Sequence, residues 1–281
     1  MKYGLNSLVW ISPFSNKHLD MLKLARDMGF DVFEIAVESP ELIDCASIRD
    51  VAQSAGISTP LSGAFSANRD LSSRDNLVRG NAIKYLKTLI DYAAELDSGY
   101  VAGPMYAATG DASLKTPEEK EGQIKRAVES IRLCAEYAKS YGIMLAIEPL
   151  NRFETDLINT VKQGDALIDR IGMDNIGLLL DTFHMNIEEK SISGAIRNAK
   201  SRIVDFHSSA SDRGTPGQDN LDWLVIAEAL KDVGYDGNLI IESFTPDCLE
   251  IAKAASIWRP LAESPEALAR DGLKFLKSIF N

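Results

Sequence analysis

The chain has 281 residues, of which 45% are hydrophobic and 25% charged, an ordinary composition for a globular protein with a sizeable core. Its formal net charge of −11 opposes binding to the phosphate backbone of nucleic acids and to anionic membrane surfaces. The sequence holds no run of about 18 apolar residues, so we expect no segment to span a membrane.

Short apolar strands and amphipathic helices are predicted to alternate strictly along the chain. A helical pattern, a glycine and an apolar run recur in that order, and a glycine just past a helix ends it in the left-handed conformation. Apolar residues repeat at steps of three and four within residues 82–96 and 124–138, as in helices that pack on a sheet. The predicted strands are Tyr3–Leu8, Val32–Ala36, Ser58–Leu61, Tyr100–Gly103, Met144–Glu148, Ile176–Asp181, Ile203–His207 and Leu239–Glu242.

Eight strand–helix pairs predict the fold class. Strict alternation gives a parallel sheet, and a (β/α)8 barrel typically needs about 250 residues, so residues 1–281 are predicted to form a single (β/α)8 TIM barrel. No GxGxxG motif follows the first predicted strand, which disfavours a dinucleotide-binding fold.

The number and spacing of the cysteines, and the N-terminal segment, indicate the cellular compartment of the protein. The three cysteines are far apart and form no CxxC motif, so neither a disulfide framework nor a cysteine-rich zinc site is expected. The segment MKYGLNSLVWISPF has no long apolar run, which predicts that it is not a signal peptide. Together these features predict a cytoplasmic protein.

Residues that can bind a metal ion end four consecutive predicted strands. They are Glu148, Asp181, His207 and Glu242, each preceded by an apolar run. Active sites of such barrels lie at the carboxyl ends of the strands, so these side chains are predicted to meet there. Three carboxylates and one imidazole favour Mn²⁺, Mg²⁺ or Co²⁺, and zinc also accepts such ligands. The sequence therefore predicts a site for one divalent metal ion.

Four runs around these positions resemble a known family. They are EPLNRFE (148–154), LINT (157–160), DTFHMNIEE (181–189) and ESF (242–244). They are similar to runs of the ketose 3-epimerases, which act on D-tagatose, D-allulose (D-psicose) or L-ribulose. These enzymes belong to a wider superfamily of barrel sugar isomerases that includes endonuclease IV. The resemblance covers nearly the whole chain, and DTFHMNIEE is its most specific part.

The resemblance implies a reaction and residue roles. The protein would invert C3 of a free ketose through an enediolate, with Mn²⁺ as the expected ion. Glu148 and Glu242 would be the catalytic acid and base as well as metal ligands, alongside Asp181 and His207. The substrate would be bound by Glu154, His184 and Arg213. The family also implies a homo-oligomer, either a dimer or a tetramer.

Some residues near these motifs have no assigned role. Several relatives carry a glycine–glutamate pair soon after the metal-binding histidine, whereas this chain has Ser209 and Ala210, so its sugar preference is not predicted. Glu34, in the second predicted strand, is either a partner of the site residues or part of an internal ion pair. Trp10 and Phe244 are candidates for an apolar wall beside the sugar.

Three other functions compete with the epimerase interpretation. A related barrel isomerase or dehydratase for an inosose or hydroxypyruvate would use the same metal and bases with a different pocket. A non-catalytic sugar-binding barrel would not need both Glu148 and Glu242. An endonuclease would need a basic surface and more metal ligands, and this chain has only three histidines.

Overall fold

The strands of the protein form a closed parallel barrel, which confirms the predicted fold class. The structure is a computed structural model that describes residues 1–244 and 246–280. Each strand pairs in parallel with the next one in the chain, and the eighth pairs with the first. The strands are β1 (Lys2–Asn6), β2 (Val32–Val37), β3 (Leu61–Gly63), β4 (Tyr100–Gly103), β5 (Met144–Ile147), β6 (Ile176–Asp181), β7 (Ile203–His207) and β8 (Asn238–Ile241).

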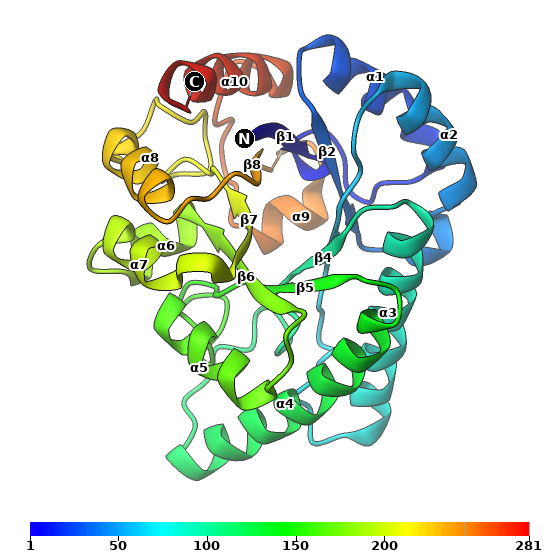
Figure 1. The fold of residues 1–281 in the computed structure, drawn as a ribbon, viewed down its shortest axis with the longest axis vertical. Helices are drawn as coiled ribbons and strands as arrows, with labels where there is room; N and C mark the ends of the chain where they lie inside the picture. Colours follow the sequence, from blue (N-terminus) through cyan, green and yellow to red (C-terminus); the bar gives the residue numbers. More distant parts are fainter. Residues whose placement is uncertain (245, 281) are drawn as a thin grey trace.

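The helices surround the strands, as Figure 1 shows. Most of them connect one strand to the next, and α10 packs against both β1 and β8 where the barrel closes. The α-helices are α1 (Asp20–Asp27), α2 (Cys45–Ala55), α3 (Asn76–Glu95), α4 (Pro117–Lys139), α5 (Val161–Ile171), α6 (Thr182–Glu188), α7 (Ile192–Ala199), α8 (Trp223–Asp232), α9 (Leu249–Ala254) and α10 (Pro265–Phe280). Short 3₁₀ helices are η1 (Ser7–Val9), η2 (Asn16–His18), η3 (Pro40–Leu42) and η4 (Lys200–Arg202).

Five of the eight strands differ in their bounds from the prediction. The first strand spans Lys2–Asn6 rather than Tyr3–Leu8, because the chain turns into η1 at Ser7, and the second ends one residue later than predicted. The third strand begins at Leu61 rather than Ser58, which forms only an isolated bridge to Val32. Pro60 has no amide hydrogen to donate, so the ladder cannot run through it unbroken. The fifth and eighth strands end one residue earlier than predicted, so Glu148 and Glu242 follow these strands directly.

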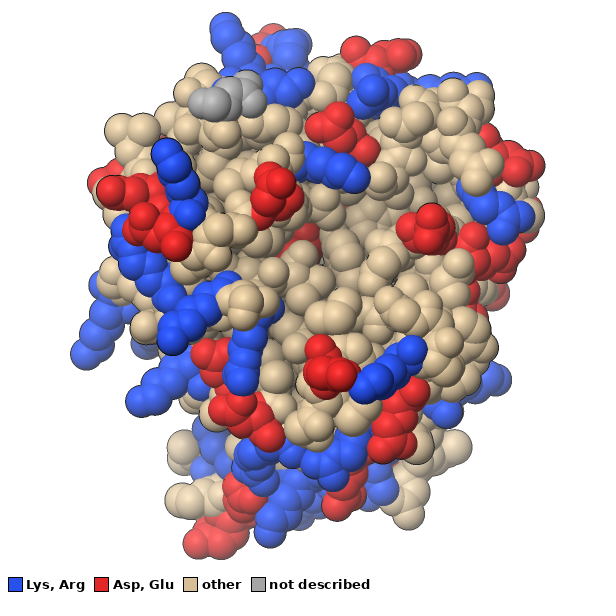
Figure 2. Space-filling model, viewed as in Figure 1, with Lys and Arg blue, Asp and Glu red and all other residues tan. Residues whose placement is uncertain are grey.

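The predicted glycine caps are present. Gly56 and Gly172 end α2 and α5 with φ of 67° and 69°, a left-handed conformation that glycine adopts without a steric penalty. No helix among the described residues is long and apolar enough to cross a membrane. Figure 2 shows acidic and basic side chains interleaved around one face of the molecule.

The barrel interior changes from apolar to polar toward the carboxyl ends of the strands. Successive side chains of a strand point to opposite sides, so residues two apart share the inner face. Ala146 and Leu179 belong to a small apolar cluster separate from the main core. They lie two residues before Glu148 and Asp181, so these carboxylates also project into the barrel, at its carboxyl end.

Candidate metal and catalytic site

The structure brings the four predicted metal ligands together. Glu148, Asp181, His207 and Glu242 are all buried, and each has a ligand atom within 4.8 Å of those of the other three. We refer to them as the four-residue cluster. They come from four adjacent segments of the barrel wall, at or just after the ends of β5, β6, β7 and β8. The alternation of side chains along each strand therefore accounts for their convergence.

The donor set of the cluster fits a divalent cation. His207 Nδ1 lies 3.5 Å from Glu242 Oε2 and 3.8 Å from Asp181 Oδ2. This nitrogen is buried and has no hydrogen-bond partner among the described residues. Buried carboxylates are costly unless a positive charge faces them, and an unpartnered imidazole nitrogen is a ready ligand. A mainly oxygen set with one imidazole suits Mn²⁺, Mg²⁺ or Co²⁺.

Glu34 holds the other side of the His207 ring. Its Oε1 lies 3.0 Å from His207 Nε2 and accepts a hydrogen bond of 2.6 Å from Asn6 Nδ2. Burial alone would raise the pKa of Glu34, but His207 and these hydrogen bonds lower it on balance. Because the Glu34 carboxylate pairs with Nε2, the ring is oriented with Nδ1 toward the cluster. Carboxylates commonly orient metal-binding histidines in this way. The only sign of this role in the sequence is that Glu34 is a charged residue inside the otherwise apolar strand VFEIAV.

Arg213 supplies a positive charge within the site. Its Nη1 donates hydrogen bonds to Asp181 Oδ2 at 2.6 Å and to Glu242 Oε2 at 2.9 Å. Its guanidinium also lies over the rings of Phe183 and Phe244, at 4.2 and 5.1 Å from their centroids. Burial raises the pKa of Asp181, but the positive charge of Arg213 outweighs this effect and holds that pKa well below its usual value. Asp181 is therefore an anion that can accept from donors and bind a cation.

His184 and Glu154, predicted to bind substrate, share a partner. The backbone N–H of Asn151 donates to His184 Nδ1 at 3.1 Å, and its side-chain amide donates to Glu154 Oε1 at 2.7 Å. His184 Nε2 lies 3.1 Å from Arg213 Nη2 and 3.5 Å from Glu148 Oε1. Glu154, His184 and Arg213, the three residues predicted to bind substrate, therefore lie around the same space.

That space is a cavity of about 300 Å³ at the carboxyl end of the barrel. Two of the cluster residues, Glu148 and Glu242, line it together with the three predicted substrate residues. Its remaining wall is mainly apolar and includes Phe65, Phe244 and Ile251. Trp10 is not part of this wall and stacks on Phe33 instead, with 5.9 Å between ring centroids.

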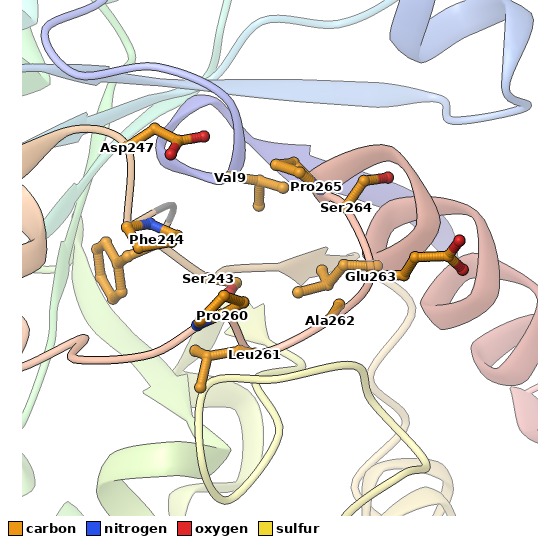
Figure 3. A pocket seen from close by; sticks show the side chains of 12 residues that line it. Val9, Ser243, Phe244, Asp247, Pro260, Leu261, Ala262, Glu263, Ser264 and Pro265 are labelled. Atoms are coloured by element: carbon orange, nitrogen blue, oxygen red, sulfur yellow. The ribbon is translucent and has the colours of Figure 1, made fainter.

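Phe244 lines a second, smaller cavity as well. The second cavity has a volume of about 170 Å³ and is lined by residues of η1, of the segment after β8, of the stretch 260–264 and of the start of α10. Figure 3 shows Phe244 at its edge, with Val9 and the chain from Pro260 to Pro265 around the space. None of the predicted metal-binding, catalytic or substrate-binding residues lines this second cavity.

Burial of His184 makes the stability of the metal-free protein depend on pH. Burial lowers the pKa of His184 from 6.5 to about 4. Between these values the unfolded chain binds a proton at the imidazole and the folded chain does not, so stability falls as the pH is lowered. The shift corresponds to about 3 kcal/mol of unfolding free energy.

We therefore expect the unfolding free energy of His184→Gln to decline less steeply than that of the wild type between pH 7 and pH 4. Urea titrations of both proteins, freed of metal, measure the two slopes. Parallel curves for the two proteins would show that the histidine is not held neutral in the fold.

Comparison with known proteins places the chain in a family. Residues 22–279 match the model of the xylose isomerase-like TIM barrels. A probable ketose 3-epimerase from Synechocystis is 34% identical over 280 residues, covering 100% of this chain and 97% of the relative. An L-ribulose 3-epimerase from Mesorhizobium japonicum is also 34% identical, covering 98% of this chain and 93% of the relative. The chain therefore belongs to the xylose isomerase-like TIM-barrel family.

Solved structures agree with this placement. A structure of L-ribulose 3-epimerase superposes with a TM-score of 0.94 at 34% identity, covering 99% of this chain and 94% of the other. A D-psicose 3-epimerase from Clostridium cellulolyticum H10, solved with D-tagatose, gives 0.91 at 31% identity and covers all of both chains. Within the family the chain groups with the ketose 3-epimerases, and it is an enzyme of the isomerase class.

Proposed function

We propose that this protein is a metal-dependent epimerase that inverts C3 of a free, non-phosphorylated ketose, with residues 1–281 as one catalytic domain. The single observation that carries the proposal is the pair Glu148 and Glu242. Both line one cavity, and both belong to the four-residue cluster. The names of the relatives, which are D-psicose and L-ribulose 3-epimerases, support the substrate class.

Inversion at C3 requires a base and an acid on opposite faces of the sugar. The C3 proton lies beside the C2 carbonyl, so its removal gives an enediolate, and return of a proton to the other face completes the inversion. Glu148 follows β5 and Glu242 follows β8, with β6 and β7 between them. A ketose in the cavity would therefore have one carboxyl group at each side. In one direction of the reaction Glu148 takes the proton and Glu242 gives one, and in the reverse direction the roles exchange.

The electrostatics of Glu148 support a role in proton transfer. Burial and the neighbouring Glu242 raise the pKa of Glu148 well above its ordinary value. A carboxyl group with a raised pKa can hold and release a proton near neutral pH, as a general acid or base must. Both glutamates face the cavity, so neither has to move far to reach a bound sugar.

The remaining residues would bind the ion and the sugar. Glu148, Asp181, His207 and Glu242 would hold one divalent ion, with Mn²⁺ expected, and such an ion supplies Lewis-acid stabilisation of the developing enediolate charge. Glu154, His184 and Arg213 present polar groups around the cavity and would bind the hydroxyl groups near C1 to C3. A homo-oligomer stays a prediction from the family resemblance.

Proton exchange at C3 tests this proposal. Purified protein with Mn²⁺ is incubated in deuterated water with a panel of free ketoses, including D-allulose, D-tagatose and L-ribulose. We expect deuterium at C3 and the C3 epimer, both seen by NMR. A double variant, Glu148→Gln with Glu242→Gln, controls for contaminating enzymes. Dehydration or aldose products without C3 inversion would contradict the proposal, as would a complete lack of label with every sugar.

A further inference from the structure

The hydroxyl group of Ser209 links a predicted metal ligand to a predicted substrate residue. Ser209 Oγ donates a hydrogen bond of 3.1 Å to Asp181 Oδ2 and accepts one of 3.0 Å from Arg213 Nη1. Ser209 is fully buried, so water does not compete for either bond. The hydroxyl group thereby uses its only hydrogen and one of its two lone pairs to join the two residues.

The backbone of Ser209 is held in place independently of its side chain. Thr182 Oγ1 lies 2.5 Å from the carbonyl oxygen of Ser209 and 3.2 Å from that of His207, and its one hydrogen donates mainly to the nearer oxygen, that of Ser209. Thr182 directly follows Asp181 at the start of α6. The segment after β7 is thereby tied to the residue next to the carboxylate, so the Ser209 hydroxyl has a defined position relative to Asp181.

Asp181 presents only one oxygen to the cluster. Its Oδ1 accepts the backbone N–H of Phe183 at 2.7 Å, which caps α6. Its Oδ2 therefore faces the cluster, held by Ser209 and Arg213. A divalent cation beside Oδ2 would repel the guanidinium of Arg213, whereas the neutral hydroxyl of Ser209 would not be repelled and could still donate to Asp181.

We propose that Ser209 is a positioning residue that orients Asp181 toward the metal ion and holds Arg213 at the substrate cavity. The inference rests on the metal site of the proposed function. It predicts that removal of this one hydroxyl weakens metal binding and substrate binding together. Mutation of a residue that orients a metal ligand typically weakens metal affinity roughly 10- to 100-fold, and we expect an effect of this size.

The neighbouring residue provides a matched control. Ser208 is also fully buried, but its hydroxyl has no hydrogen-bond partner among the described residues. Ser208→Ala and Ser209→Ala therefore remove the same group from adjacent buried positions. Only the second change removes a bridge to Asp181 and Arg213.

The first experiment measures Mn²⁺ affinity by calorimetry after chelation and dialysis. We expect the Kd of Ser209→Ala to rise roughly 10- to 100-fold and that of Ser208→Ala to stay within about twofold of the wild type. At saturating Mn²⁺, we expect KM for the ketose to rise more than kcat falls in Ser209→Ala, because Arg213 has lost a partner. Equal Mn²⁺ affinities for the two alanine variants would overturn the proposal.

A second pair of variants covers the case in which Ser209→Ala does not fold. Ser209→Thr and Ser209→Val add side chains of nearly the same shape, and only threonine keeps the hydroxyl. We expect the threonine variant to bind Mn²⁺ at least about tenfold more tightly than the valine variant. Equal affinities in this pair would also overturn the proposal, because steric strain is common to both.

The outcomes separate this inference from the proposed function. If no ketose exchanges its C3 proton but the hydroxyl still controls Mn²⁺ affinity, the epimerase proposal fails and the role of Ser209 stands. If the wild type binds neither Mn²⁺, Co²⁺ nor Mg²⁺, the metal site and the role of Ser209 both fail. If C3 exchange is normal in both alanine variants with unchanged Mn²⁺ affinity, only the role of Ser209 fails.

Discussion

Replacing Glu148 or Glu242 with glutamine is expected to lower epimerisation by about 10²–10⁴-fold in both directions, which is the usual contribution of a general acid or base. Glutamine keeps a neutral oxygen that can contact the ion but cannot accept a proton at neutral pH. Complete inversion uses both faces of C3, so loss of either carboxylate stops the full reaction. Initial rates from both epimers, measured by NMR or chromatography, test this expectation.

Half of the reaction is expected to survive in each variant. With one carboxylate intact, each variant can still remove the C3 proton of the epimer that faces it. Glu148→Gln and Glu242→Gln should therefore exchange deuterium into opposite epimers. Exchange into the same epimer in both variants would indicate that one mobile base serves both faces.

Metal content must be measured alongside these rates, because both glutamates belong to the four-residue cluster. Glu136→Gln makes the same chemical change at an exposed position of α4 and serves as the control, with wild-type rates expected. A glutamine variant that keeps its metal and near-normal epimerisation would exclude the two-base mechanism for this protein.

Removal of the metal ion is expected to abolish epimerisation, and addition of Mn²⁺, Co²⁺ or Mg²⁺ is expected to restore it. The physical reason is that the enediolate charge needs a cation beside it in a buried, largely apolar cavity. Arg213 already pairs with Asp181 and Glu242, so the metal-free protein should stay folded while inactive. Circular dichroism and turnover, measured before and after chelation, separate these two effects.

The Asp181→Asn variant sharpens this prediction. We expect it to lower the affinity for the ion first and the activity as a consequence, so excess Mn²⁺ should recover part of the rate. A bound ion also raises the melting temperature, since it binds the folded chain and not the unfolded one. Full turnover after exhaustive chelation, with metal analysis showing an empty site, would refute the metal assignment.

Much of the barrel was predictable because its signals are local. Apolar runs such as Ile176–Asp181 and glycines such as Gly172 identify a strand or the end of a helix from neighbouring residues alone. The third strand was placed too early because Ser58–Leu61 comes just after the glycine that ends a helix, as several of the other predicted strands do, whereas the hydrogen-bond ladder begins only after Pro60.

The convergence of the four-residue cluster was also predictable, because it follows from two local facts. Each of its members stands at the end of an apolar strand, and all strands of such a barrel end on the same side. Strand periodicity then directs each side chain inward. The sequence by itself therefore determined the fold class and which four residues meet.

Only the tertiary structure decided which partners orient these residues. Glu34 contacts His207 across 173 positions of sequence, and Arg213 reaches both Asp181 and Glu242 from the segment after β7. The difference between Ser208 and Ser209 is likewise invisible in the run HSSAS, because both are buried serines after the same strand. The physical reason is that periodicity indicates whether a side chain points inward, whereas hydrogen-bond partners depend on how separate strands and loops are placed when the barrel closes.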